Sequence, residues 1–106
     1  MSSMIGDSGE FPEGKAVRVK TEDGVPVAVV RIDGALYAVA DTCSHAKYSL
    51  SEGEVYVEER EIECWKHGST FSLLDGHPTC FPATQPVAVY DVEERGNQVF
   101  IRERRA

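Results

Sequence analysis

The distribution of apolar and polar residues along the chain predicts short strands joined by tight turns. Residues 15–20 alternate apolar and charged side chains, which is typical of a strand with one buried face. Residues 27–32 and 36–40 are rich in β-branched and small apolar side chains, and Asp33 and Gly34 between them give a strong two-residue hairpin signal. The first part of the chain is therefore predicted to be antiparallel β-structure.

The rest of the chain continues this pattern around an irregular, polar middle. A polar passage at 47–61 precedes short apolar runs that predict strands at 61–64, 69–74, 86–92 and 98–102. Three prolines within residues 77–86 mark a loop. No stretch shows sustained helical periodicity. The sequence therefore predicts an all-β fold, either an antiparallel β-sandwich or a partly open barrel.

Length and composition indicate the class of protein. A chain of 106 residues is long enough for one domain, which we expect over 11–106 after a flexible tail at 1–10. No apolar run approaches the roughly 20 residues of a membrane helix, so no membrane association is expected. The N-terminus lacks the basic start and apolar segment of a secretory signal, which predicts a cytoplasmic protein.

The charge of the chain narrows the possible partners. A formal net charge of −7 at pH 7 argues against nucleic acid, because the phosphate backbone would be repelled. The same charge suits docking on a basic partner surface, and a role in solubility alone explains it equally well.

Candidate chemistry is concentrated in two unequal Cys/His pairs. One residue separates Cys43 from His45, and two residues separate Cys64 from His67. The chain has three cysteines and three histidines, so two compact pairs are hard to attribute to chance. An odd and small number of cysteines also argues against a disulfide framework. We therefore expect a metal site.

Two kinds of metal site fit these pairs. A structural zinc site with two Cys and two His is one possibility, although zinc fingers usually place like ligands together. A mixed pair in each loop fits a centre of two irons better, with both cysteines on one iron and both histidines on the other. This is the ligation of a Rieske [2Fe–2S] centre.

The pairs and their surroundings resemble a known family. C-x-H followed by C-x-x-H, together with "SEGEV", "IECWKHGSTF" and "CFPATQPVAVY", resembles the small Rieske-type ferredoxins of bacterial ring-hydroxylating dioxygenase systems. The resemblance is strong over residues 41–92. It implies a Rieske-type β-fold with a cluster-binding subdomain at about 41–85, formed by two ligand loops and a proline loop.

The resemblance also implies one cofactor and its ligands. A single Rieske-type [2Fe–2S] cluster would be bound by Cys43 and Cys64 on the inner iron. His45 and His67 would bind the outer iron, close to the surface where a partner docks.

Residues next to the ligands are expected to shape the surroundings of the cluster. We expect an apolar collar that includes Trp65, Phe81 and Pro82, of which Pro82 matches the proline loop of the family. For Trp65 the alternative is a core position. Phe71 could belong to the same collar, although a simple core position is the better interpretation. Ser69 occupies the place of a serine that donates a hydrogen bond to the cluster.

Other positions separate the subclasses of this family. Tyr48 and Lys66 stand where respiratory members have two further cysteines in a disulfide, and Phe71 stands where the high-potential proteins have a tyrosine. With one of two hydroxyl donors missing, we expect a reduction potential of about −150 mV, at the low end of the Rieske range. The hydroxyl of Ser69 is a reason to expect a slightly higher value. Cys80 is expected to be a small buried residue, and His77 a turn residue.

The sequence therefore predicts an electron carrier and not a catalyst. After the cluster has used two histidines, His77 alone cannot build the two-His mononuclear iron site of an oxygenase. The expected partners are a flavin-dependent ferredoxin reductase and a terminal Rieske non-haem iron oxygenase. Alternatives are a Rieske small subunit or accessory ferredoxin of another redox system, a zinc-stabilised binding module, and a thiol enzyme using Cys80 and His77.

Overall fold

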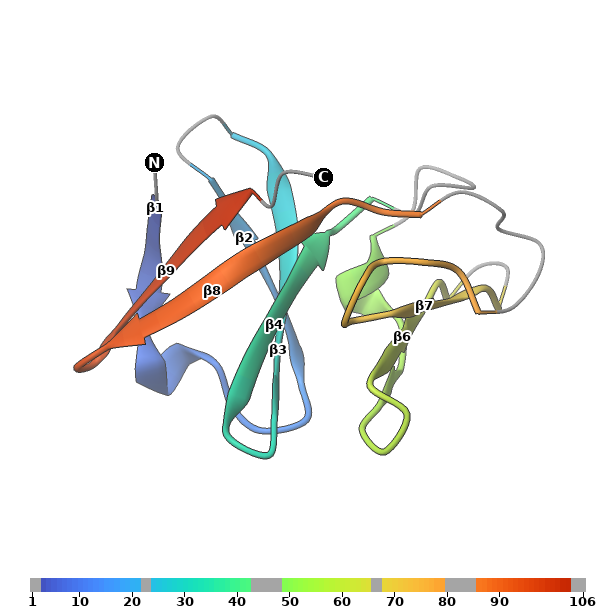
Figure 1. The fold of residues 1–106 in the computed structure, drawn as a ribbon, viewed down its shortest axis with the longest axis horizontal. Helices are drawn as coiled ribbons and strands as arrows, with labels where there is room; N and C mark the ends of the chain where they lie inside the picture. The colour runs from blue at the N-terminus through green and yellow to red at the C-terminus, as the bar shows by residue number, and fades with distance from the viewer. Residues whose placement is uncertain (1–2, 22–23, 43–48, 66–67, 80–85, 104–106) are drawn as a thin grey trace.

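Two antiparallel sheets form the molecule (Figure 1). The computed structural model describes residues 3–21, 24–42, 49–65, 68–79 and 86–103. Within them, a large sheet has the order β1-β9-β8-β4-β3-β2 and a small sheet the order β5-β6-β7. This confirms the predicted all-β class and its barrel-like form.

The elements are short, as the sequence pattern predicts. The strands of the large sheet are β1 (Ser3–Asp7), β2 (Ala16–Lys20), β3 (Pro26–Ile32), β4 (Ala35–Ala40), β8 (Val89–Arg95) and β9 (Gln98–Glu103). The small sheet contains β5 (Val55–Tyr56), β6 (Glu61–Glu63) and β7 (Thr70–Ser72). Two 3₁₀ turns, η1 (Ser8–Glu10) and η2 (Leu50–Glu52), complete the described elements. No helix in this part of the chain has the length and apolarity needed to span a bilayer.

Strand β3 lies between two apolar cores. Val27 and Val29 pack on one face of the large sheet, in a cluster that includes residues of β4, β8 and β9. Ala28, Val30 and Ile32 pack on the other face, against the small sheet. Because both faces are buried, β3 needs apolar residues at successive positions, which explains its run of small and β-branched side chains from Val27 to Val30.

The structure places strand β1 within the segment 1–10 that was expected to be a flexible tail. Strand β1 pairs antiparallel with β9, with Ser3 opposite Ile101 and Met4 opposite Phe100, and its register shifts between Met4 and Gly6. The main-chain pairing with β9 orders this segment, and Ile5 packs on the barrel core. Main-chain pairing leaves little trace in side-chain pattern, so the sequence did not reveal it.

Two other segments differ from the prediction. The polar passage at 47–61 contains both η2 and β5. Strand β8 begins later than expected and continues to Arg95, which pairs with Gln98 across a two-residue turn. This end of the β8–β9 hairpin carries exposed charged side chains, so its polar sequence resembles that of a loop.

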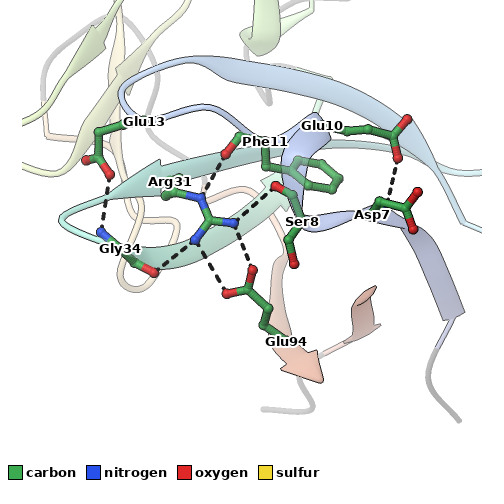
Figure 2. A network of polar contacts seen from close by, with 8 residues as sticks. All are labelled: Asp7, Ser8, Glu10, Phe11, Glu13, Arg31, Gly34 and Glu94. Carbon is green, nitrogen blue, oxygen red and sulfur yellow. Dashed lines mark hydrogen bonds and ion pairs between the residues drawn. The ribbon is translucent and has the colours of Figure 1, made fainter. Parts of the chain in front are cut away.

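Arg31 on β3 makes several contacts to the segment that follows β1 (Figure 2). The Arg31 side chain is only 16% exposed. Its Nε donates to the carbonyl of Phe11 at 2.8 Å, and its terminal nitrogens donate to the carbonyls of Ser8 and Gly34 at 3.4 and 3.2 Å. The same nitrogens contact both carboxylate oxygens of Glu94, at 3.0 and 3.4 Å. Arg31 thus links η1, the β3–β4 hairpin and β8.

Carboxylates make further contacts to the main chain around this arginine. Glu13 accepts hydrogen bonds from the main-chain nitrogens of Asp33 and Gly34, at 2.5 and 3.2 Å. Glu10 accepts one from Asp7 at 2.6 Å. Figure 2 shows the Glu10 and Glu13 carboxylates on either side of the Arg31 contacts. The N-terminal segment is therefore an integral part of the fold.

Gly53, just after η2, allows two segments to approach closely. A Cβ at this position would lie 1.6 Å from the carbonyl oxygen of Glu63. We expect Gly53→Ala to destabilise the protein by about 1–3 kcal/mol, because the main chain must move to relieve the clash. Thermal unfolding followed by circular dichroism measures this. Gly9→Ala is the control, since no atom lies within 4 Å of its added Cβ. Equal melting temperatures for the two variants would contradict the expectation.

Candidate metal centre

The β6–β7 hairpin positions one predicted ligand, Cys64. This residue follows β6 directly, and its side chain is completely buried. The Cys64 N–H donates to the carbonyl of Ser69 at 2.7 Å, and the Gly68 N–H donates to the carbonyl of Cys64 at 2.9 Å. Gly68 has a φ of +74°, which suits glycine in a tight turn. These contacts close a short loop with Cys64 at its buried end.

The first ligand loop has a closed base at the end of β4. The Asp41 N–H donates to the carbonyl of Pro26 at 3.1 Å, and the Asp41 carbonyl accepts from the Leu50 N–H at 2.5 Å. An antiparallel bridge joins Thr42 to Ser49. The residues on either side of 43–48 are therefore held next to each other.

The proline loop also begins and ends at fixed points. The Thr79 N–H donates to the carbonyl of Thr70 at 2.8 Å, and the two hydroxyl oxygens lie 2.5 Å apart. On the far side of the loop, the Val87 N–H donates to the carbonyl of Gly76 at 2.9 Å. Both ends of this loop are thus attached to the chain around β7. Figure 1 shows β7 at the small-sheet end of the molecule.

The described residues include one of the four predicted ligands. Cys64 is a free, buried cysteine. Cys43, His45 and His67 lie outside the described residues, as do Tyr48, Lys66, Cys80, Phe81 and Pro82. Among the residues that the structure does describe, no three His, Cys, Asp or Glu side chains lie close enough together to hold a metal ion. Ligation by the full set therefore stays a prediction.

The surroundings of Cys64 fit a sulfur ligand of an iron–sulfur cluster. Cys64 shares its buried apolar cluster with Leu50, Ile62, Phe71 and Leu73. Leu50 lies just after the first ligand loop, and Cys64 begins the second. Residues next to both loops therefore belong to the same group of buried apolar side chains. An apolar environment keeps water from thiolate sulfur and influences the reduction potential. The set of two cysteines and two histidines is the donor set of a Rieske centre.

The neighbours of the ligands occupy distinct environments. Trp65 is 49% exposed, whereas Ser69 and Phe71 are fully buried. The expected core position of Phe71 is confirmed. The exposed surface of Trp65 suits a collar around the cluster, and the collar itself stays a prediction. His77 is exposed and follows the turn at 73–75, and its main-chain N–H donates to a carboxylate oxygen of Asp75 at 3.0 Å.

Strands β5 and β6 of the small sheet are joined by a polar side-chain pair. The Tyr56 hydroxyl on β5 donates to the carboxylate of Glu63 on β6 at 3.0 Å. This hydrogen bond raises the pKa of Tyr56, because loss of the proton would leave two negative groups in contact. The pair adds polar contacts between the two strands that lead to Cys64.

Asp41 is a residue that the sequence analysis did not single out. Its side chain is 1% exposed, and an oxygen of its carboxylate lies 3.2 Å from Nε of Arg18. A signal was present, because an acidic residue directly follows the buried strand β4 and precedes Cys43 by two positions. The pattern could not show that the carboxylate turns inward.

Relatives with known roles match most of the chain. The 3-phenylpropionate/cinnamic acid dioxygenase ferredoxin subunit of Escherichia coli (strain K12) is 39% identical over 93 residues, which are 87% of this chain and 84% of that protein. The protein of the same name from Shigella flexneri serotype 5b (strain 8401) has the same identity and coverage.

Solved structures agree with the sequence relatives. The ferredoxin of carbazole 1,9a-dioxygenase from Nocardioides aromaticivorans IC177 superposes with a TM-score of 0.91 at 31% identity, covering 95% of this chain and 96% of that chain. A chain from a complex of reduced oxygenase and oxidized ferredoxin in carbazole 1,9a-dioxygenase gives 0.86 at 33% identity, covering 94% and 91%. Residues 2–91 match the family described as the Rieske [2Fe-2S] domain. This chain therefore belongs to the Rieske [2Fe-2S] domain family.

Proposed function

We propose that this protein is the ferredoxin component of a ring-hydroxylating dioxygenase system and carries one electron at a time. The observation that carries the proposal is the relation to dioxygenase ferredoxin subunits over 87% of the chain. Both Cys/His pairs fall within the residues that match the Rieske family. The protein is an electron-transfer component and does not itself catalyse oxygenation.

The residues assigned to the cluster have distinct roles. Cys43 and Cys64 would hold the inner iron, and His45 and His67 the outer iron. When bound, the cluster supplies a group that accepts and releases one electron. The buried apolar side chains around Cys64 exclude water from the side of the iron–sulfur cluster that the cysteines would bind. The side that the histidines would bind would face the docking surface beside Trp65. Electron exchange with a partner would therefore occur at this end of the molecule.

The proposed partners follow from this role. This chain resembles one chain of a carbazole 1,9a-dioxygenase complex, which contains an oxygenase and a ferredoxin. We propose a terminal Rieske non-haem iron oxygenase as the electron acceptor here. A flavin-dependent reductase is the proposed donor, because a flavin can pass on the electrons of a nicotinamide hydride. We place the protein in the cytoplasm, where reduced nicotinamide is produced.

Electron paramagnetic resonance of the dithionite-reduced protein tests the proposal. We expect a rhombic signal with an average g near about 1.9, and equal amounts of iron and acid-labile sulfide. The midpoint potential is expected near about −150 mV, because Phe71 cannot supply a second hydroxyl donor to the cluster. A potential above about +100 mV would contradict this subclass. A colourless protein with stoichiometric zinc would instead support a zinc-stabilised binding module.

A further inference from the structure

The buried polar side chains of the described residues lie at the two predicted ligand loops. They are Asp41, which is 1% exposed, and Ser69, which is fully buried. Ser69 closes the loop that begins at Cys64, and Asp41 lies at the base of the loop that contains Cys43. A buried carboxylate costs free energy unless its charge is paired and hydrogen-bonded. The position of Asp41 therefore calls for a physical explanation.

Asp41 joins three parts of the fold through both its side chain and its main chain. One carboxylate oxygen accepts from the Ser51 N–H at 2.8 Å, and the other lies 3.2 Å from Nε of Arg18 on β2. The main chain of Asp41 bonds to Pro26 on β3 and to Leu50 on η2. These contacts fix both ends of the first ligand loop to β2 and β3.

Closure of the loop does not by itself require a charge. A neutral asparagine side chain could accept the hydrogen bond from Ser51 equally well. The carboxylate instead places a negative charge two residues before Cys43 in the sequence. In a poorly solvated environment such a charge acts strongly on a neighbouring redox group. Arg18 is 53% exposed, so water weakens its ability to neutralise Asp41.

We propose that Asp41 is a positioning residue for the cluster, with Arg18 as its partner. Its contacts hold together the residues on either side of the first ligand loop, and its negative charge disfavours addition of an electron to the iron–sulfur cluster. Arg18 opposes that charge, so the pair sets the potential of the cluster. This inference rests on the proposed function, because it requires the cluster to bind Cys43.

Asp41→Asn tests the charge with little change of shape. We expect the variant to retain the cluster and its hydrogen bond to Ser51. Its redox equilibrium should shift toward the reduced form by about three- to tenfold, which is about 30–60 mV upward for one electron. Arg18→Gln should shift the equilibrium in the opposite direction, because the carboxylate loses its partner. Redox titration of the purified holoprotein, with the reduced-state g values recorded, measures both.

A matched control separates this effect from general loosening of the fold. Arg95→Gln removes a pair of similar geometry, 2.9 Å to Glu93, in which both side chains are more than half exposed. This variant should keep the potential and g values of the wild type. Arg18→Lys keeps the positive charge and should restore most of the wild-type potential. Should Asp41→Asn fail to fold, the two Arg18 variants still test the proposal.

Each result has a definite meaning. Opposite shifts in Asp41→Asn and Arg18→Gln support the inference. Shifts of the same sign, or a wild-type potential in Asp41→Asn, overturn it and leave Asp41 with a structural role alone. A wild-type protein that contains no iron–sulfur cluster overturns the proposed function as well.

Discussion

Replacing Cys64 with serine is expected to abolish the iron–sulfur centre. A serine oxygen is a much poorer ligand for an iron–sulfur cluster than a thiolate, because these clusters take soft sulfur donors. The side chain at this position is completely buried in an apolar cluster. A serine hydroxyl there would also lose its hydrogen bonds with water, which adds to the cost. The purified variant should lack iron, acid-labile sulfide and the reduced-state resonance.

Cys80→Ser is the matched control for this experiment. It changes the same atom in another cysteine of the chain, one that is not a predicted ligand. We expect this variant to retain wild-type iron, colour and potential. A cluster lost from Cys80→Ser but kept in Cys64→Ser would reverse the assignment of the ligands. Equal retention in both variants would remove Cys64 from the site.

Replacing Arg31 with methionine is expected to give the largest loss of stability among the substitutions considered. The change leaves the carbonyls of Ser8, Phe11 and Gly34 without their donor. We expect a cost of about 2–4 kcal/mol, because several charge-assisted hydrogen bonds are lost together in a partly buried position. The melting temperature should fall by roughly 10 °C or more for a domain of this size. Circular dichroism at increasing temperature provides the measurement.

The control again uses Arg95, which also contacts a nearby glutamate but is exposed. Arg95→Met should leave the melting temperature close to that of the wild type, because exposed ion pairs contribute little. An equal fall in both variants would show that loss of a positive charge, and not the Arg31 contacts, is responsible.

The contribution of Arg31 should also depend on pH. Its hydrogen bonds to Glu94 hold the pKa of that carboxyl below the ordinary value of 4.5, with a smaller contribution from Ser8. A lowered pKa in the folded state stabilises the protein above about pH 4.5, and this stabilisation is lost as the pH falls through the lowered value. The difference in melting temperature between the wild type and Arg31→Met should therefore narrow in acid.

The sequence predicted those strands and turns that depend on the pattern of side chains. The run of apolar residues in β3 and the glycine-containing hairpin after it predicted both elements, and Asp33 and Gly34 have the positive φ values that such a turn requires. Strand β1 was missed because its main chain, more than its side chains, determines its pairing. The charged end of β8 was missed because a solvated hairpin needs no apolar alternation.

The candidate site was visible in the sequence for a different reason. Metal ligands are rare residue types at short spacings, so Cys64 and the other three candidate ligands could be predicted without knowledge of the fold. Its burial and its apolar neighbours could not, because they come from Leu50 and Phe71, which lie on other segments. The inward direction of the Asp41 carboxylate depends on contacts with β2 and η2, which no local pattern records.

The position of β3 between two cores has a consequence for the lifetime of the protein. Because β3 borders both apolar cores, loss of either core exposes one face of this strand to water. Opening of the small-sheet side, where Cys64 lies, would therefore weaken the barrel on the opposite face of β3. Because a bound metal centre stabilises the folded chain by mass action, the supply of iron and sulfide also governs how long each chain escapes proteolysis.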